Sequence, residues 1–338
     1  MLGFWNKLDK PIFALAPMAD VTDAAFRRII AEVGKPDVMW TEFVSADGLA
    51  LAPEMGRKKL LKSLEYSEAE RPIVAQFFTS SPENMKKAAE LARELGFDGV
   101  DINMGCPDKS VEKQGAGASL MKNVTLARVL VRAAKEGANP LPISVKTRTG
   151  YSQPELEHWL PEILKEDVAV VTVHARTRKE MSKVPARWEF IRRAVEIRDA
   201  SGKETLILGN GDVKNLEKAR ARIKETDCDG VMLGRAIFGN PWLFSGSSRS
   251  DLGNQNLRSD PFFPPVRERL RVLVKHAKLF EELLGGYKSF AMMKKHLKSY
   301  LSGIDGAVDL RAKLMDANNA SEVEKIVSEF LKNRIIQA

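Results

Sequence analysis

Two neighbouring stretches decide the fold of this chain: TLILGNGDV at Thr205–Val213 and GVMLGR at Gly230–Arg235. Each begins with an apolar run of strand length and then passes into glycine and polar residues, where a strand ends and a loop begins. Between them, Asn215–Glu225 carries apolar residues at helical spacing. A strand, a helix and a second strand in this order form the unit from which parallel sheets are built.

The same unit recurs along the first 244 of the 338 residues. Short apolar runs predict eight strands, at Ile12–Ala16, Val38–Trp40, Ile73–Gln76, Gly99–Ile102, Ile143–Lys146, Val170–Val173, Thr205–Leu208 and Gly230–Leu233. Amphipathic stretches predict helices between them, at Ala24–Val33, Pro82–Leu95, Leu126–Glu136, Glu155–Glu166, Trp188–Ala200 and Asn215–Glu225. Asp23 and Pro82 are typical helix starts, and Gly34, Gly96 and Gly137 are typical helix ends. The pattern predicts an α/β fold, a TIM (β/α)8 barrel, with an insertion at Ser45–Arg71.

The composition changes after Phe244. The segment SGSSRSDLGNQNLRS at Ser245–Ser259 is rich in Ser, Gly and Asn, which is typical of a linker. Helical patterns return at Val266–Leu284, Tyr287–Ser302 and Ser321–Arg334, with a further turn near Leu310–Asp316. The sequence therefore predicts a catalytic barrel at residues 1–244, a linker at 245–260 and a small helical domain at 261–338.

The bulk composition narrows the functional class. The chain has a net charge of +8, which suits a polyanionic partner although many proteins are mildly basic. Its two cysteines cannot form a disulfide framework, so we expect reduced thiols in a reducing compartment. No apolar run reaches the roughly 20 residues that span a bilayer, and no secretory signal precedes the first strand. We expect a cytoplasmic monomer without a metal site, and no protein partner is indicated.

Polar residues gather where the predicted strands end. In strand order these ends carry Pro17 and Met18, Glu42, Gln76, Asn103 with Cys106, Lys146 with Arg148, His174 with Arg176, Asn210-Gly211-Asp212, and Gly234-Arg235. A barrel places its active site at the carboxyl ends of its strands. One polar group at a strand end is often a loop cap, but a nearly complete rim of them indicates a site.

The last two strand ends predict a phosphate site. Loops after the seventh and eighth strands bind phosphate in many barrels, and Gly211 and Gly234 let the main chain approach it while Arg235 supplies a forked cation. FMN is the leading ligand. Lys146 would stabilise negative charge on the reduced flavin, Gln76 would pair with its imide edge, and His174 would hydrogen-bond the flavin or its phosphate; a structural histidine is the alternative.

The two cysteines receive different interpretations. Cys106 lies in DINMGCP at Asp101–Pro107, where Gly105 and Pro107 force a loop that presents the thiol at the rim, so we expect it to act in catalysis, as an acid or as a nucleophile. Cys228 precedes the eighth strand and is expected to be buried and inert. His158, His276 and His296 have no comparable neighbours and are expected on the surface or on helix faces.

These motifs resemble the tRNA-dihydrouridine synthase family. The matching stretches are LAPMADVTDAAFR (Leu15–Arg27), DINMGCP (Asp101–Pro107), VKTRTGY (Val145–Tyr151), VHARTR (Val173–Arg178), LGNGDV (Leu208–Val213) and VMLGRAIFGNPWLF (Val231–Phe244). The helical tail, with KKHLKSYL at Lys294–Leu301, is similar to the RNA-binding domain of that family.

The resemblance implies a function and a set of site residues. It implies that FMN is held by Pro17, Met18, Gln76, Lys146, His174, Asn210, Gly211, Asp212, Gly234 and Arg235. It implies that NAD(P)H reduces FMN, that hydride passes from flavin N5 to C6 of a uracil in tRNA, and that Cys106 protonates C5. Asn103, Arg148 and Arg176 would orient the base or its phosphate, and the uridine would have to leave its stack to reach the barrel.

One segment departs from the family pattern, and two alternatives remain open. After HARTR the chain has KEMSKVPARWEFI at Lys179–Ile191 in place of an aromatic-plus-glycine pattern, although Trp188 is kept. A flavin barrel that reduces a free pyrimidine, similar to dihydroorotate dehydrogenase, would share the barrel and FMN but would have no need of a basic helical tail. A non-catalytic RNA-binding barrel would have no need of Cys106, Lys146 and His174.

Overall fold

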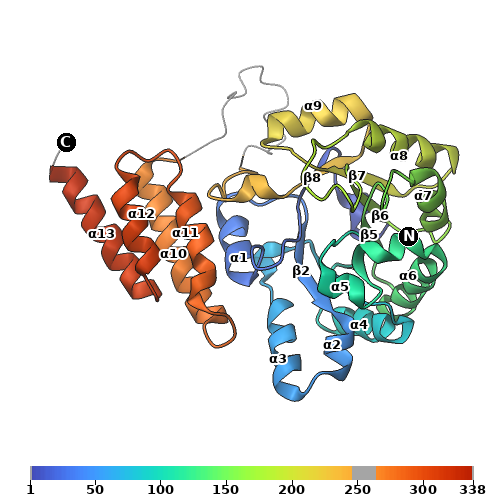
Figure 1. Cartoon of the computed structure of the whole chain (residues 1–338), viewed down its shortest axis with the longest axis horizontal. Helices are drawn as coiled ribbons and strands as arrows, with labels where there is room; N and C mark the ends of the chain where they lie inside the picture. The colour runs from blue at the N-terminus through green and yellow to red at the C-terminus, as the bar shows by residue number, and fades with distance from the viewer. Residues whose placement is uncertain (1, 246–263, 337–338) are drawn as a thin grey trace.

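The structure is a computed structural model that describes residues 2–245 and 264–336, shown in Figure 1. It contains a barrel of strands and helices and, beside it, a group of four C-terminal helices. The predicted linker at 245–260 lies outside the described residues apart from Ser245.

Eight parallel strands form the barrel, as the sequence predicts. They are β1 (Ile12–Leu15), β2 (Met39–Ser45), β3 (Ile73–Phe78), β4 (Gly99–Asn103), β5 (Ile143–Arg148), β6 (Val170–His174), β7 (Leu206–Asn210) and β8 (Gly230–Leu233). Their order in the sheet is β1-β8-β7-β6-β5-β4-β3-β2, and a bridge between Ala14 and Val38 joins the two ends into a ring. β2 runs to Ser45, beyond the predicted end at Trp40. The prediction ended too early because Thr41 and Glu42 interrupt the apolar pattern of the sequence, although they do not break the strand.

Helices cover the outside of the ring (Figure 1). They are α1 (Ala24–Val33), α4 (Pro82–Glu94), α6 (Val124–Ala138), α7 (Leu156–Leu164), α8 (Glu189–Ala200) and α9 (Leu216–Thr226), all predicted within about two residues. The Asp23 side chain caps α1 by accepting a hydrogen bond from the Phe26 N–H. Gly137 does not end α6, contrary to the prediction. It lies inside the helix where α4 crosses, and a Cβ there would come within 2.2 Å of the Lys86 carbonyl oxygen.

The predicted insertion between β2 and β3 is helical. It contains α2 (Ala46–Leu51) and α3 (Glu54–Ser63), followed by the short 3-10 helix η2 (Glu68–Glu70). The loop after β4 carries α5 (Lys109–Lys113) and the 3-10 helix η3 (Gly117–Lys122), which the sequence did not predict because they are too short to show helical periodicity. Two further 3-10 helices, η1 (Gly3–Lys7) and η4 (Arg235–Ile237), flank the barrel strands in sequence.

The barrel is packed on both faces of its sheet. Along β1, Ile12 and Ala14 belong to the cluster inside the ring, while Phe13 and Leu15 pack against the outer helices. Trp40 lies in the interior cluster, and the Trp5 ring of η1 meets it at 5.8 Å between centroids. Burial on both faces explains why the strands appear in the sequence as nearly continuous apolar runs.

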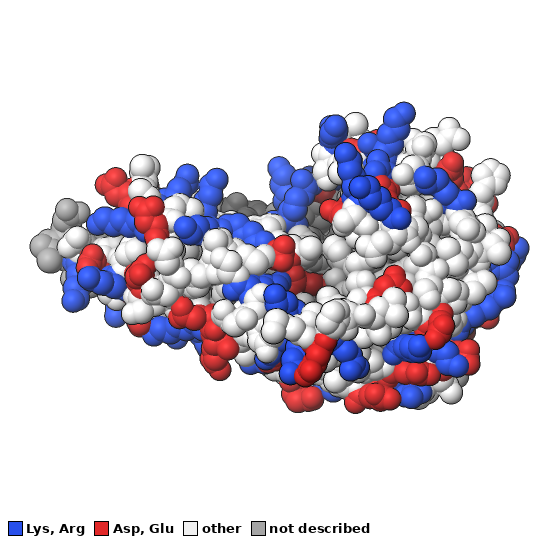
Figure 2. Space-filling view, turned by 60° about the horizontal axis from the view of Figure 1, so that its bottom comes forward, with Lys and Arg blue, Asp and Glu red and all other residues white. Residues whose placement is uncertain are grey.

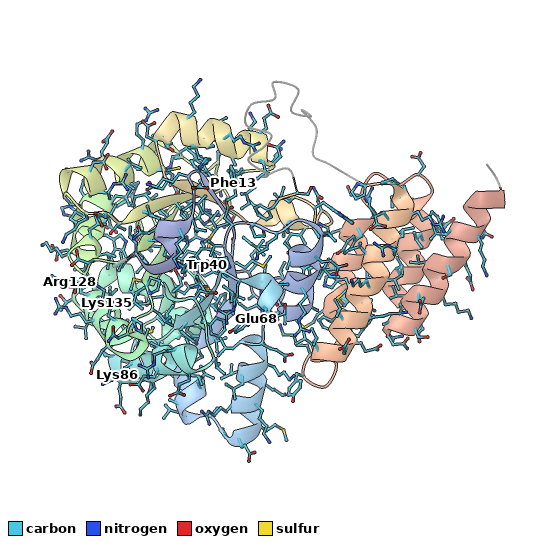
Figure 3. All side chains as sticks on the ribbon, turned by 180° about the vertical axis from the view of Figure 1, so that it is seen from behind. Phe13, Trp40, Glu68, Lys86, Arg128 and Lys135 are labelled. Atoms are coloured by element: carbon cyan, nitrogen blue, oxygen red, sulfur yellow. The ribbon has the colours of Figure 1, made fainter. Side chains whose placement is uncertain are left out.

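Charged side chains tie the outer helices to one another. In Figure 3, Arg128 and Lys135 of α6 and Lys86 of α4 lie on the outside of the barrel, away from the four-helix group. Arg128 donates to Glu166 at 2.7 Å, and Lys86 donates to Glu136 at 2.5 Å. These pairs join helices of the outer ring and lie apart from the site described below.

The C-terminal helices are α10 (Val266–Leu284), α11 (Lys294–Tyr300), α12 (Ala307–Asp316) and α13 (Ala320–Ile336), with the 3-10 helix η6 (Phe290–Met293) before α11. The helix predicted at Tyr287–Ser302 begins only at Phe290, where Ser289 caps it, and its first four residues form a 3-10 helix that continues into α11. The turn predicted near Leu310–Asp316 is a ten-residue helix.

His276 of α10 and His296 of α11 lie on helix faces, one of the two predicted locations, and these faces are buried against α1. His276 and His296 are 0% and 1% exposed, and their rings lie 4.9 and 4.6 Å from the Phe26 ring of α1. Burial lowers the pKa of His276 well below its usual value and that of His296 to about 3, so both are neutral. His158 is exposed, as expected, and Cys228 is buried.

A charged contact also joins the C-terminal helices to the barrel. The Lys288 ammonium donates to both carboxylate oxygens of Glu42 at 3.0 and 2.9 Å and to Asp20 at 3.3 Å. Glu42, predicted as a polar strand end, thus contacts the C-terminal region. Among the described residues, no helix combines the length and the apolar character that a membrane crossing requires.

Candidate active site

The strand register aligns the predicted site residues around the carboxyl ends of the strands. Asn103 of β4 pairs with Lys146 of β5, and Arg148 of β5 pairs with His174 of β6. His174 in turn pairs with Asn210 of β7. Because parallel strands end on the same edge, these side chains meet at one mouth of the barrel.

A cleft of about 550 Å³ opens at this mouth. Nine of the ten predicted cofactor residues line it: Pro17, Met18, Lys146, His174, Asn210, Gly211, Asp212, Gly234 and Arg235. A cleft of this volume is in the range that holds a cofactor. Gln76 does not line the cleft and is fully buried.

The loops after β7 and β8 form a cradle at one end of the cleft. Gly211 has a φ of +133°, and a Cβ there would come within 2.8 Å of the Ala186 Cβ, so only glycine fits. A Cβ on Gly234 would meet Ala16 and Met18 at 3.5 Å and would narrow the cleft. Main chain without side chains, next to the Arg235 guanidinium, is chemistry that suits a phosphate group.

Asp212 organises the cations around this cradle. Its carboxylate accepts hydrogen bonds from the Ala186 N–H at 2.9 Å, from the Arg235 guanidinium at 2.7 Å and from Arg176. Burial alone would raise the pKa of Asp212, but the bonds from Ala186 and Arg176 outweigh it, and the pKa lies below its usual value. The ionised carboxylate therefore holds Arg235 at the edge of the cleft, where its side chain is still 64% exposed.

His174 and Lys146 set the charge in the middle of the cleft. Burial, together with the neighbouring cations Arg148 and Lys146, lowers the pKa of His174 well below its usual value. The His174 Nε2 lies 3.2 Å from the Arg176 guanidinium, which can only donate, so the neutral ring accepts there and carries its proton on Nδ1. Burial and Arg148 lower the pKa of Lys146 to about 8, which leaves it a cation at neutral pH.

A chain of buried hydrogen bonds runs beneath the other half of the mouth. Ser144 and the Gln76 amide donate to Asp101 at 2.5 and 2.7 Å, and the Asn103 amide donates to the Gln76 oxygen at 3.0 Å. The Asn103 oxygen accepts from the Gly105 and Cys106 N–H groups at 3.2 and 2.9 Å. The main chain that carries Cys106 is thereby fixed to the floor of the barrel.

The Cys106 thiol is partly buried beside Phe78, Val111 and Ala116. Burial raises the pKa of this thiol, while the nearby cations Arg148 and Lys146 lower it to a smaller extent. A thiol whose pKa is raised keeps its proton at neutral pH and is able to donate it.

Arg148 and Arg176 are buried and use their guanidinium groups within the protein. Arg148 donates to the Gly105 carbonyl at 2.7 Å and to the carbonyls of Thr177 and Met181 at 3.2 and 3.1 Å. Arg176 donates to the Val184 carbonyl at 2.6 Å. Both arginines thus join the loop after β6 to the floor of the mouth. Their predicted contact with substrate stays a prediction.

Several residues of the mouth were not predicted from the sequence. Ser182, Val213, Lys214 and Ala236 line the cleft, and Glu112 of α5 forms a two-pronged ion pair with Arg178 of the loop after β6. Val213, Lys214 and Ala236 follow directly on predicted residues, so extending the strand-end rule by two positions would have found them. Ser182 and Glu112 lie in loops whose path depends on tertiary contacts.

Comparisons with known proteins were made for the sequence and for the fold. The family model described as dihydrouridine synthase (Dus) matches residues 14–336. A protein of Bacillus subtilis (strain 168) named probable tRNA-dihydrouridine synthase 2 is 38% identical over 330 residues, which cover 97% of this chain and 96% of the relative. A probable tRNA-dihydrouridine synthase of Staphylococcus aureus (strain COL) is 36% identical, covering 97% and 95%.

Among solved structures, histamine dehydrogenase from Rhizobium sp. 4-9 superposes with a TM-score of 0.52 at 14% identity, over 79% of this chain and 48% of that one, which shows a shared barrel fold alone. The family match and the two relatives each extend over nearly the whole length of the chain. The chain belongs to the dihydrouridine synthase family and is an oxidoreductase.

Proposed function

We propose that this protein reduces uridine in tRNA to 5,6-dihydrouridine, with FMN as its cofactor and NAD(P)H as the reductant. The observation that carries the proposal is the pairing of two features at one barrel mouth. One is a cofactor-sized cleft with a glycine and arginine cradle, and the other is a protonated, partly buried thiol fixed by Asn103. The names of the relatives and the family match support the choice of substrate.

The residues of the cleft fit FMN. The cradle at Gly211, Gly234 and Arg235 would hold the phosphate, and Lys146 would lie where negative charge grows on a reduced flavin. When bound, FMN would carry a hydride equivalent from NAD(P)H to C6 of the uracil. Gln76, predicted to pair with the flavin, is buried beneath the mouth, and we propose that it acts mainly by orienting Asn103.

Cys106 would supply the proton that completes the reduction. Addition of hydride at C6 builds negative charge at C5 and the C4 carbonyl, and the S–H bond of Cys106 would break as the C5–H bond forms. The thiolate that results would be stabilised by Arg148 and Lys146, the two cations that act on this thiol, until solvent returns the proton.

The C-terminal helices would bind the RNA. Lys and Arg side chains gather on the helical region and on the barrel, on either side of the hollow between them (Figure 2). Lys298 of α11 is exposed, whereas Lys288 is turned toward Glu42 of the barrel. We propose that residues 1–244 form the catalytic barrel and that residues 261–338 bind tRNA through phosphate contacts.

The test uses the purified full chain. We expect a yellow protein whose flavin NADPH or NADH bleaches under anaerobic conditions and which unmodified tRNA then reoxidises, with dihydrouridine detected by mass spectrometry. Free uridine serves as the control for a pyrimidine reductase. A protein that takes up no flavin, or that reduces free uridine as well as tRNA, would contradict the proposal.

A further inference from the structure

The loop after β6 ends in an exposed apolar tip at the edge of the cleft. Met181 and Val184 are 38% and 37% exposed, and Ser182 between them lines the cleft. Exposure of this degree is ordinary for a surface side chain, and what distinguishes this pair is its position beside the cleft, where a ligand could cover both side chains.

Three side chains of the barrel mouth, two of them buried arginines, hold this tip in one shape. Arg148 donates to the Met181 carbonyl at 3.1 Å, Arg176 donates to the Val184 carbonyl at 2.6 Å, and the Asp212 carboxylate accepts from the Ala186 N–H at 2.9 Å. All three side chains come from strand ends at the barrel mouth. The main chain of the tip is therefore preformed and needs no reorganisation to meet a ligand.

The backbone at Met181 is strained. Its φ is +57°, in the left-handed region of the backbone that residues other than glycine and asparagine seldom adopt. Strain of this kind persists where the surrounding contacts over-determine a conformation, and it occurs most often at functional sites. Here the strain presents the Met181 side chain to solvent.

The exposed charges around the tip are positive. Lys179 and Lys183 are exposed, whereas Glu180 forms an ion pair with Arg187 at 2.6 Å. Apolar side chains flanked by lysines match a ligand that combines flat apolar faces with a chain of phosphates. A nucleic acid is such a ligand.

We propose that Met181 and Val184 form a wedge that packs against the nucleobase next to the target uridine and stabilises the stack from which that uridine has been extruded. Apolar side chains inserted at a base step offset the cost of unstacking, which is a few kcal/mol for one base. The inference rests on the proposed function. It assigns to this loop the extrusion of the uridine, the step that precedes reduction.

The test replaces the wedge and leaves its anchors intact. The double variant Met181→Ser/Val184→Ser keeps the carbonyls that Arg148 and Arg176 hold. We expect kcat/KM for folded tRNA to fall about tenfold or more, because extrusion loses its apolar support. With a short unstructured oligonucleotide that carries the same uridine, the loss should stay within about threefold, since no stack must be opened.

A matched control and an optical readout make the test decisive. Leu95→Ser/Val129→Ser removes an equally exposed apolar pair, at 41% and 37%, from the outer helical ring and should reduce both RNAs at the wild-type rate. A 2-aminopurine placed beside the target uridine should brighten when the wild type binds and brighten less with the wedge variant. This fluorescence decides the matter if the short oligonucleotide is a poor substrate for the wild type.

The results that would contradict the wedge differ from those that would contradict the proposed function. If the wild type reduces folded tRNA and the wedge variant does so equally well, the wedge is wrong and the proposed function stands. An equal loss on both RNAs would make the tip a general structural element and would also overturn the wedge. A changed sedimentation coefficient with unchanged RNA reduction would show a contact between copies of the chain instead. If the wild type reduces neither RNA, the proposed function and the wedge fall together.

Discussion

The two halves of the barrel mouth use their polar side chains differently. At β1 and β5–β8, Lys146 and Arg235 line an open cleft and present groups to a ligand. Beneath the mouth at β3–β5, Gln76 and Asn103 are hydrogen-bonded to each other and to neighbouring groups. The open half suits a binding site, because a ligand must be able to reach its donors. The closed half suits the support of a catalytic group, because such a group must be held in place next to the reacting atom.

Substitutions in the two halves should therefore impair different steps. Damage to the open half should lower the affinity for FMN while the thiol keeps its position. Damage to the closed half should slow the reduction of RNA while the flavin stays bound. Four experiments test this division.

The largest effect is expected for Cys106→Ala. Loss of a general acid lowers rates by roughly 10²- to 10⁴-fold, so single-turnover reoxidation of the reduced flavin by tRNA should slow by that factor. Binding of FMN and its reduction by NADPH should not change. Cys228→Ala, at the buried cysteine that precedes β8, is the control. Turnover at the wild-type rate would remove Cys106 from the acid role.

Asn103→Ala should have the next largest effect, because it removes the acceptor that fixes the Gly105 and Cys106 N–H groups. We expect reduction of tRNA to slow by about 10- to 100-fold, in line with a loss of about 1–3 kcal/mol for an unpaired buried group. Iodoacetamide should also alkylate Cys106 faster.

Asn103→Asp keeps a side-chain acceptor for both N–H groups and should lie between the wild type and the alanine variant. If the alanine variant shows the wild-type rate of alkylation together with slow reduction, Asn103 acts on the substrate and not through the loop.

Arg235→Ala tests the open half. Its side chain is 64% exposed and shared with Asp212, so we expect the dissociation constant of FMN to rise only about tenfold. Fluorescence titration of the flavin-free protein measures this constant. Arg192→Ala, an exposed arginine on α8, should bind FMN as the wild type does. Full retention of FMN by the Arg235 variant would place the phosphate elsewhere.

The smallest effect is a pH dependence that comes from Lys146. Its pKa is lowered to about 8, so the cation is present below pH 8 and is lost as the pH rises through that value. A ligand that carries negative charge favours the protonated form, and the affinity for FMN should therefore fall several-fold between pH 7 and pH 9. Lys146→Met should bind more weakly at pH 7 and lack this dependence. A wild-type affinity that does not change over this range would contradict the role of Lys146.

The sequence predicted the barrel well, because each strand is an apolar run bounded by glycine or polar residues and several helices begin at a capping residue such as Asp23. Nine of the ten residues that it assigned to the cofactor line the cleft for the same reason, since strand ends are visible in the chain and parallel strands end together. It failed where a residue's surroundings come from distant segments. Gly137 was taken for a helix end because α4, which packs on α6 there, is remote in sequence. For the same reason the sequence did not show that the helix faces of His276 and His296 are buried against Phe26 of α1.

By itself, then, the sequence determined the barrel, the position of the cleft and the identity of the cysteine at its rim, because local periodicity and strand ends carry that information. Only the tertiary structure decided which polar groups are free to meet a ligand and which are bonded within the protein. Gln76, Arg148 and Arg176 look equivalent to Lys146 in the chain, yet their partners lie 25 or more residues away or in a loop of irregular course. Burial and hydrogen bonding depend on all the neighbours of a group, and the fold alone brings those neighbours together.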